Sequence, residues 1–361
     1  MRSGDVTSVP ARLEVIAEIK AGDPAARSHE VRSGQAVSIM TGAPLPPGAD
    51  AVVMVEHTNQ SGHTVEIQRS VGSGDNFVPQ GAEARAGQTL LERGTRLDHA
   101  AIALAAAVGK NRLSVFGKPR VAVLATGDEI VGIDQQPGPS QIRNSNTYSL
   151  AVQIQRAGGE PVLLPVAPDE RGRLRELITE GLKSDLLLLA GGVSMGKHDL
   201  VEQVLLGFGA DFYFTGAKIQ PGKPIVFGSC GRAKPVLSER SESQGVPDRH
   251  TYFFGLPGNP VSTMVTFELF VWPMIEAFSG AKPKPLVFLR ARLKSQVPTK
   301  TGLKRFLPAA LSGEFENAEV ELVQWQGSGD VSALAMANCY LVVPPDRETI
   351  AAGEWVPVLV R

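Results

Sequence analysis

The segment TYFFGLPGNPVSTMVTFELFVW, residues 251–272, reads as a buried strand that passes directly into an apolar helix. The turn favours a helix start at Pro260, because proline suits the first helical position and Asn259 is a good N-cap. Gly258 lets another backbone or a ligand approach closely. A helix N-terminus with free N–H groups and Ser262 in its first turn suits an anion. These residues leave two interpretations open, an anion site or a stiff corner without a ligand.

The alternation of strand and helix extends well before this segment. Continuous apolar runs at 121–125 (VAVLA) and 185–190 (DLLLLA) are typical of strands buried on both faces. The chain between them predicts a helix, a strand and an amphipathic helix, at 146–159, 161–166 and 169–183. We therefore predict a doubly wound α/β domain over residues 117–281.

The flanking regions have a different character. Residues 1–85 contain short alternating runs, LEVIAEI, DAVVMVE and HTVEIQ, separated by Gly/Pro turns, and predict a β-rich domain. Residues 86–116 include TRLDHAAIALAAAVG, which has helical composition and ends at Gly109, a plausible C-cap. After KPKP, residues 282–361 return to short β segments and predict a small β domain.

Composition limits the classes of partner and the compartment. The 361 residues carry a formal net charge of −1, which argues against nucleic acid as a partner. Two cysteines, Cys230 and Cys339, are too few for a disulfide scaffold and fit a reducing cytosol. The first residues lack a signal-peptide profile, and we expect the longest apolar helical run, 100–108, to be too short to span a bilayer. These features predict a cytoplasmic protein without a membrane partner.

Several unusual loops follow predicted strands of the α/β domain. In open α/β sheets, ligands bind outside the carboxyl ends of the strands, so we expect these loops to gather at one edge. TGDE places Asp128 and Glu129 just after a buried strand, and such carboxylates suit Mg²⁺ or simply cap a loop. AGGVSMGKHD (190–199) offers backbone N–H groups for phosphate, and Asp199 as another metal ligand.

Lys223, on the Pro-Gly turn of IQPGKPIVFG (219–228), is either a phosphate clamp or a charged turn residue. Micromolar binding needs about 8 kcal/mol, whereas a helix terminus supplies roughly 0.3–1 and a charge-assisted hydrogen bond about 1.5–3. The PGNP corner alone is therefore too weak to hold an oxyanion, and Lys223 and the glycine loop would have to join it. Thr41, beside Gly42, and Ser328, in a Gly-Ser-Gly loop, are unremarkable by themselves.

The motifs together point to one family. MTGAPLPPGADAVV, TGDEI, IRNSNTYSL, GGVSMGKHD, QPGKP, LPGNPVS and QGSGDVSALAMAN occur in this order over nearly the whole chain. In this combination the chain resembles the molybdopterin molybdenumtransferases, the group that includes the gephyrin E-domain. The resemblance implies an elongated, multi-domain homodimer. Its central α/β molybdopterin-binding domain would lie between a β-rich N-terminal domain and a small C-terminal β-barrel-like domain.

The resemblance also implies an activity and a set of site residues. The activity is transfer of molybdenum from molybdate to adenylylated molybdopterin, with release of AMP and a requirement for Mg²⁺. By matching position, Asp128, Glu129 and Asp199 would act on metal and phosphate, and Lys223 would join them in catalysis. The residues that would bind substrate are Thr41, Gly191, Gly192, Ser194, Pro224, Gly258, Asn259, Ser262 and Ser328.

The chain departs from the family pattern at three places. Gln220 stands where many relatives have a lysine, and Pro308 where several have an arginine, although Arg305 is close. Family members also begin some tens of residues earlier, so residues 86–116 would be the helical remnant of the dimerisation domain. Two alternative functions are a molybdopterin adenylyltransferase, which could instead be a contact partner, and a molybdopterin-binding scaffold with impaired catalysis.

Overall fold

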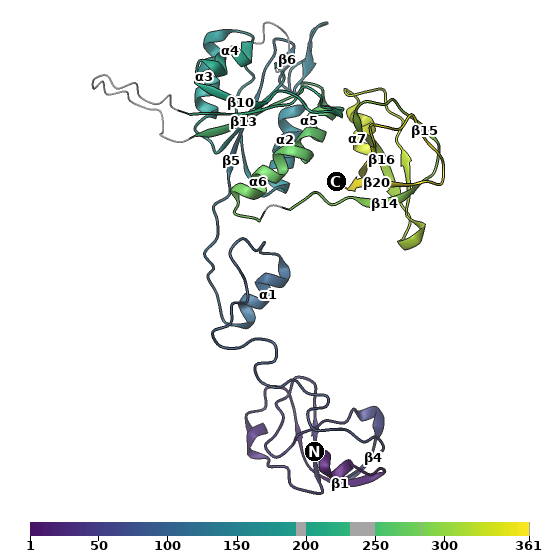
Figure 1. The fold of residues 1–361 in the computed structure, drawn as a ribbon. Coiled ribbons are helices and arrows are strands. Elements are labelled where there is room, and N and C mark those ends of the chain that lie inside the picture. The colour runs from purple at the N-terminus through teal and green to yellow at the C-terminus, as the bar shows by residue number, and fades with distance from the viewer. Residues whose placement is uncertain (193–199, 232–249, 283, 361) are drawn as a thin grey trace, which may run out of the picture. The chain divides into compact units, whose positions relative to one another are not determined.

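The computed structural model describes residues 1–192, 200–231, 250–282 and 284–360. The chain divides into two compact units, Met1–Leu91 and Glu92–Arg361. The larger unit contains the α/β sheet and a C-terminal barrel, and Figure 1 shows the helices of the α/β sheet and the barrel beside it. The division into four segments at residues 85, 116 and 281 stays a prediction.

The first unit is built on a four-stranded sheet. The strand order is β2-β1-β4-β3, with β1 parallel to β2 and antiparallel to β4. Its core gathers Val6, Leu13, Val65 and Ile67. The strands are β1 (Ala11–Ile19), β2 (Gln35–Ile39), β3 (Thr58–Ser61) and β4 (Thr64–Ile67), with 3-10 turns η1 (Ser3–Val6), η2 (Pro24–Ser28) and η3 (Val55–His57).

One predicted strand of this unit is absent. Residues 50–54 of DAVVMVE form no strand, and η3 follows them directly. The backbone N–H groups of this stretch bond to irregular segments instead: the Ala51 N–H donates to the Met1 carbonyl and the Val52 N–H donates to the Asp75 carbonyl. An alternating pattern marks a half-buried extended chain, but a strand also needs a neighbour in register.

The central sheet has six strands in the order β10-β12-β13-β9-β5-β8. Strands β13, β9, β5 and β8 run parallel, while β12 is antiparallel to both of its neighbours. The predicted α/β class is thus confirmed, with one reversed strand. The strands are β5 (Arg120–Ala125), β8 (Glu160–Leu163), β9 (Leu186–Ala190), β10 (Ala210–Phe214), β12 (Val226–Cys230) and β13 (Thr251–Leu256).

Helices cover both faces of this sheet (Figure 1). On one face α2 (Asn146–Arg156) and α6 (Trp272–Phe278) pack on Val121, Val123, Leu186 and Leu188, together with the residues just before α6. Helix α5 (Pro260–Thr266) instead packs Val261 and Val265 with barrel residues. On the other face α3 (Arg171–Gly181) and α4 (Leu200–Leu206) pack on the alternate strand residues Ala122, Leu124, Leu187 and Leu189. This alternation explains the uninterrupted apolar runs, because every residue of such a strand faces a helix layer.

Helix α5 continues without a break through the π-helical turn η4 (Phe267–Val271) into α6. Pro273 lies in the first turn of α6, and the wider turn before it accommodates a residue that lacks an N–H and crowds the preceding carbonyl. The resulting run Pro260–Phe278 is long and apolar enough, by length and composition, to cross a membrane. The expectation that residues 100–108 form the longest apolar helical run is therefore wrong. About half of Pro260–Phe278 packs in the protein core (44% buried).

The short helix α1 (His99–Ala107) lies near the start of the larger unit. The Asp98 carboxylate caps it by accepting from the N–H groups of Ala100 and Ala101. Gly109 follows its end with φ +75°, the left-handed conformation that favours glycine as a C-cap. The helix predicted from composition is thus present, with the stop at the predicted glycine.

The C-terminal strands close into a five-stranded barrel, in which β16 pairs with both β17 and β18. The elements are β14 (Leu289–Leu293), β15 (Val297–Pro298), β16 (Lys304–Ser312), η5 (Phe315–Asn317), β17 (Glu319–Leu322), α7 (Val331–Met336), β18 (Cys339–Val343), β19 (Thr349–Ile350) and β20 (Trp355–Val360).

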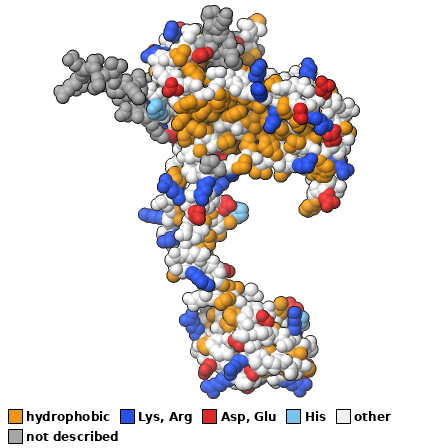
Figure 2. Space-filling model, viewed as in Figure 1, with side chains coloured by type: hydrophobic (Ala, Val, Ile, Leu, Met, Phe, Trp, Pro, Cys, Tyr) orange, Lys and Arg blue, Asp and Glu red, His pale blue; other side chains and the backbone are white. Residues whose placement is uncertain are grey.

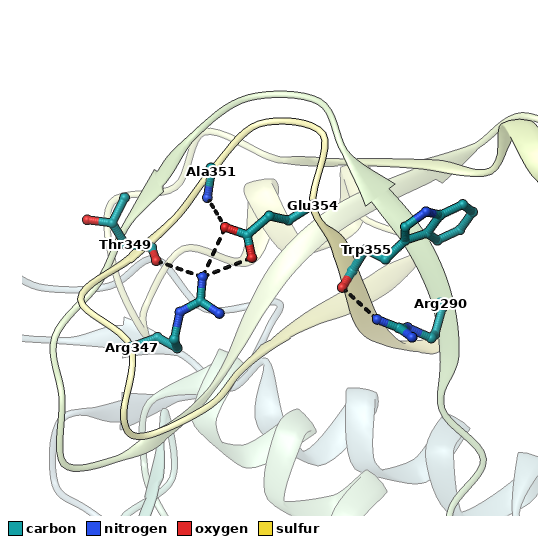
Figure 3. Close-up of polar contacts among 6 residues, drawn as sticks. All are labelled: Arg290, Arg347, Thr349, Ala351, Glu354 and Trp355. Carbon is teal, nitrogen blue, oxygen red and sulfur yellow. Dashed lines mark hydrogen bonds and ion pairs between the residues drawn. The ribbon is translucent and has the colours of Figure 1, made fainter.

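The loop between β19 and β20 is held by an ion pair between Glu354 and Arg347. The Arg347 Nη2 lies 2.9 Å from both Glu354 carboxylate oxygens (Figure 3). The pKa of Glu354 is lowered mainly by the hydrogen bond from the Ala351 N–H and to a smaller extent by the hydrogen bond from Arg347.

Candidate functional site

The turn that precedes α5 lies at the carboxyl end of β13. Asn259 occupies the predicted N-cap position, but its side chain makes no capping hydrogen bond. The expectation of several free N–H groups is corrected as well, because Pro260 has none and the Val261 N–H donates to the Ser328 carbonyl at 2.9 Å. Ser262 is 4% exposed in the first turn. An anion at this corner would thus rely on Ser262 and on neighbouring loops.

The Val261 bond brings the Gly-Ser-Gly loop of the barrel to the start of α5. This loop lines an open surface depression together with Gln326, Asp330 and Ser332. The Asp330 carboxylate holds the loop, because it caps α7 at the Ala333 N–H (3.0 Å) and also accepts from the Gln326 N–H (3.1 Å). These hydrogen bonds lower the pKa of Asp330, and the one from the Ala333 N–H has the largest effect. Ser328 and Ser262, far apart in the sequence, therefore belong to one region.

The turn that carries Lys223 packs against the same helix. Gly222 has φ +107°, and a side chain there would collide with Thr266 and lie 3.7 Å from the Ser262 carbonyl oxygen. Strand β11 (Ile219–Gln220) before the turn pairs with β16, with Gln220 opposite Arg305. Lys223 is exposed and Pro224 is half-buried. The structure thus places Lys223 and Pro224 on a turn between α5 and the barrel.

The arginine and the proline noted in β16 have different surroundings. Arg305 lies in register with Gln220, at the end of the Lys223 turn, and its Nε donates to the Lys300 carbonyl at 3.3 Å. Pro308 is buried in the barrel wall opposite Tyr340. Pro308 is therefore part of the barrel packing. Arg305, three residues earlier on the same strand, is the nearest cation in the sequence and lies where β16 pairs with β11.

The two carboxylates after β5 are both exposed. The Asp128 Oδ1 accepts from the Asp169 N–H at 3.0 Å, which ties the end of β5 to the loop after β8. Gly127 has φ +134°, and a side chain there would collide with the Glu129 carboxylate. The absence of a Cβ at Gly127 thus leaves the space that the Glu129 carboxylate occupies.

Gly191 and Gly192, which follow β9, pack closely against Thr126 at the end of β5. A methyl group on Gly191 would come within 2.8 Å of the Thr126 carbonyl oxygen, and Gly191 and Gly192 both have positive φ. A Cβ on Gly258 would lie 3.6 Å from the Gly191 Cα. The ends of β5, β9 and β13 therefore meet through backbone atoms, as expected for one sheet edge.

Three predicted site residues cannot be placed with the others. Ser194 and Asp199 lie outside the described residues. Thr41 is exposed on a turn of the first unit, next to Gly42 at φ +86°. Among the residues that the structure describes, no group of three or more His, Cys, Asp or Glu side chains could hold a metal ion. A cation at Asp128 and Glu129 would thus need ligands from beyond this pair.

Sequence reasoning missed two residues at this edge, Thr126 and Asn146. The Asn146 amide donates to the Gly258 carbonyl at 2.7 Å. Among the described residues, nothing forms a hydrogen bond with the buried Thr126 Oγ1 or Asn146 Oδ1. Asn146 stands in the motif IRNSNTYSL, but a contact between residues so distant in the chain cannot be read from one sequence.

Three family models match consecutive parts of the chain. Residues 6–109 match the "MoeA N-terminal region (domain I and II)". Residues 122–277 match a "Probable molybdopterin binding domain". Residues 290–360 match the "MoeA C-terminal region (domain IV)". The matches extend over all three parts of the fold, beyond the central domain.

Similar proteins cover the chain almost completely. It is 33% identical to the molybdopterin molybdenumtransferases of a Nostoc species and of Bacillus subtilis, over 97% of this chain and 77% and 78% of those proteins. Among solved structures, a molybdopterin biosynthesis MoeA protein from Pyrococcus horikoshii OT3 aligns with a TM-score of 0.76 at 26% identity. That alignment covers 100% of this chain and 85% of the other.

Proposed function

Since the chain belongs to the molybdopterin molybdenumtransferase family, we infer that it is a transferase of molybdenum cofactor biosynthesis. We propose that it transfers molybdenum from molybdate to adenylylated molybdopterin and releases AMP. The observation that carries this proposal is the meeting of three loops at the start of α5. These are the Gly258–Ser262 corner, the Lys223 turn and the Ser328 loop.

The chemistry of these loops suits a tetrahedral oxyanion. Lys223 supplies a positive charge, Ser262 and Ser328 supply hydroxyl donors, and the start of α5 adds the favourable end of a helix dipole. We propose that molybdate binds here, with Pro224 shaping the turn. The pterin nucleotide would lie along the sheet edge formed by Gly191, Gly192, Gly258 and Asn259, with Ser194 and Thr41 as further contacts.

The residues after β5 fit a magnesium ion. Two exposed carboxylates supply hard oxygen ligands, and Mg²⁺ usually takes one or two of these together with water and substrate phosphates. We propose that Asp128, Glu129 and Asp199 hold Mg²⁺ on the phosphates. When bound, Mg²⁺ stabilises the charge that develops as the phosphoanhydride breaks. The Asp128 carboxylate is oriented by the Asp169 N–H, so the protein fixes one ligand in advance.

An assay of molybdate-dependent AMP release tests this proposal. We expect Ser262→Ala to raise the apparent KM for molybdate about tenfold, through loss of one hydrogen bond to a charged group. Glu129→Gln keeps the shape but removes the charge, and we expect slower AMP release with molybdopterin affinity largely unchanged. Ser279→Ala, at the far end of the same helical run, is the control. Wild-type kinetics in both site variants would contradict the proposed site.

We further propose that the chain forms a homodimer in the cytoplasm. Figure 2 shows hydrophobic side chains gathered across the α/β domain and the barrel. Phe214, Phe227 and Tyr252, on β10, β12 and β13, are only partly buried, and the Phe227 ring stacks on Tyr252 and lies tilted against Phe214. Light scattering after size exclusion tests the dimer, and a monomer at micromolar concentration would contradict it.

Contact with a molybdopterin adenylyltransferase, whose product is the proposed substrate, would occur on another surface.

A further inference from the structure

Helix α2 begins beside the corner that leads into α5. The Asn144 side chain, just before the N-cap residue Ser145, accepts from the Thr147 N–H at 3.2 Å through its Oδ1 and donates to the Thr147 hydroxyl at 2.9 Å through its Nδ2. Asn146 is the first residue of α2. It is 9% exposed, and its Nδ2 donates across to the Gly258 carbonyl at 2.7 Å.

This hydrogen bond is one of several that hold the corner, since the Thr263 hydroxyl donates to the Pro257 and Asn259 carbonyls on either side of Gly258. Within the described chain, Asn146 is the only donor to the Gly258 carbonyl, and the Asn259 side chain makes no capping bond. On the other side of the corner, the Val261 N–H is held by Ser328. The carbonyl of Gly258, the residue that faces Gly191, is thus held by the Asn146 amide, while Thr263 holds the carbonyls before and after it.

The same side chain is costly for stability. Its Oδ1 is buried without a hydrogen-bond partner in the part of the chain that the structure describes. A buried, unsatisfied polar atom costs free energy of folding, whereas an apolar side chain of the same shape does not. Leucine at this position would remove the unsatisfied oxygen and also the donor to Gly258. The Gly258 carbonyl would lose its protein donor, but Gly258 is exposed, so water can replace that donor. We therefore expect leucine to cost no stability, so that the position of the Gly258 peptide is what favours asparagine.

We propose that Asn146 is a positioning residue for the transfer reaction. Its amide fixes the Gly258 peptide, and this sets the direction in which Asn259 and Ser262 face the oxyanion and the pterin nucleotide. The inference rests on the proposed function of this edge. It assigns to α2, which carries none of the proposed ligand contacts, a role in the geometry of the site.

Gln153, two turns further along α2, is the matched control. It is 7% exposed, its Nε2 donates to the Met264 carbonyl at 3.2 Å and to Glu268 at 2.8 Å, and its Oε1 is also unpartnered. The two amides thus share a helix, a degree of burial and a half-satisfied hydrogen-bonding pattern. They differ in that Gln153 contacts the middle of the α5–η4 run, and Asn146 contacts the corner.

The experiment compares Asn146→Leu with Gln153→Met in the full chain. Thermal unfolding, the apparent KM for molybdate, molybdopterin affinity by calorimetry and amide hydrogen exchange over residues 257–264 are measured. For Asn146→Leu we expect an unfolding midpoint equal to or above wild type, a KM for molybdate raised roughly tenfold and faster exchange at the corner. For Gln153→Met we expect wild-type KM and wild-type exchange over residues 257–260.

Two results would overturn the inference: wild-type KM and exchange in Asn146→Leu, or an equal loss in Gln153→Met, which would reveal a general packing effect. Asn146→Ala repeats the test with a smaller side chain if leucine does not fit. If the wild-type protein releases no AMP with molybdate, the proposed function fails. The exchange of residues 257–264 then still decides whether Asn146 holds the corner.

Discussion

At the scale of single residues, the edge of the central sheet combines close backbone approach with incomplete hydrogen bonding. Thr126 is 3% exposed, and its hydroxyl oxygen, next to Gly191 and Gly192, is buried without a partner among residues 1–192, 200–231, 250–282 and 284–360. Asn146 has a similar unpartnered oxygen at the same edge. Buried polar groups are normally satisfied, so these atoms mark a place where the fold is less stable than its shape allows.

We expect Thr126→Val to stabilise the larger unit by about 1 kcal/mol, because valine keeps the shape and removes the unsatisfied hydroxyl. Denaturant unfolding measures the change. Thr299→Val is a matched control, since the Thr299 hydroxyl is likewise buried and unpartnered within the described residues but lies beside the two-stranded β15–β19 sheet, far along the chain from Thr126. A loss of stability in Thr126→Val, with a gain in Thr299→Val, would mean that the Thr126 hydroxyl has a partner in solution.

At the scale of elements, α7 couples the Ser328 loop to the barrel through one carboxylate. Asp330 accepts from the Ala333 and Gln326 N–H groups, and its pKa is lowered from the ordinary value of 3.8. A carboxyl whose pKa is lower in the folded state stabilises the fold above its unfolded pKa. That stabilisation is lost as the pH falls through the folded pKa.

Asp330→Asn should therefore lower the thermal midpoint at neutral pH and make it less sensitive to acid. Scans between about pH 6 and pH 2 measure this, with Asp330→Ser as the variant that keeps a short capping oxygen. We also expect the KM for molybdate to rise in Asp330→Asn, because the Ser328 loop loses part of its support. Parallel pH profiles of the midpoint in wild type and Asp330→Asn would show that the cap does not titrate.

The elements also show how far one sequence could predict the structure. The buried strands and the helices at Asn146–Arg156 and Arg171–Gly181 were predictable, because continuous apolar runs and helical spacing are local signals. The uninterrupted run through Pro273 was not, since proline normally argues for a break. The same holds for the Val261–Ser328 and Asn146–Gly258 bonds, which depend on tertiary placement. Candidate residues were thus accessible, and the contacts that orient them were not.

At the scale of the whole molecule, the chain consists of two compact units, Met1–Leu91 and Glu92–Arg361, each with its own core. Units with separate cores unfold as separate cooperative transitions unless a large interface couples them. We expect calorimetry to resolve two transitions. Leu13→Ala, at a buried position of the smaller unit, should lower one of them through a loss of about 2–5 kcal/mol. Leu188→Ala, in the central sheet, should lower the other, and a shift of both by either variant would show coupling.

The helical run Pro260–Phe278 has a consequence for biosynthesis. A polypeptide leaves the ribosome from its N-terminus, and domains generally fold as units during synthesis. All six strands of the central sheet precede Pro260, and β13 ends only four residues before it. The sheet face that receives η4 and α6 is therefore complete in the nascent chain before they emerge, whereas Val261 and Val265 of α5 pack with barrel residues that are synthesised later. The second half of a segment apolar enough for a bilayer thus meets its own docking surface at once, which shortens the time in which the targeting machinery could capture it.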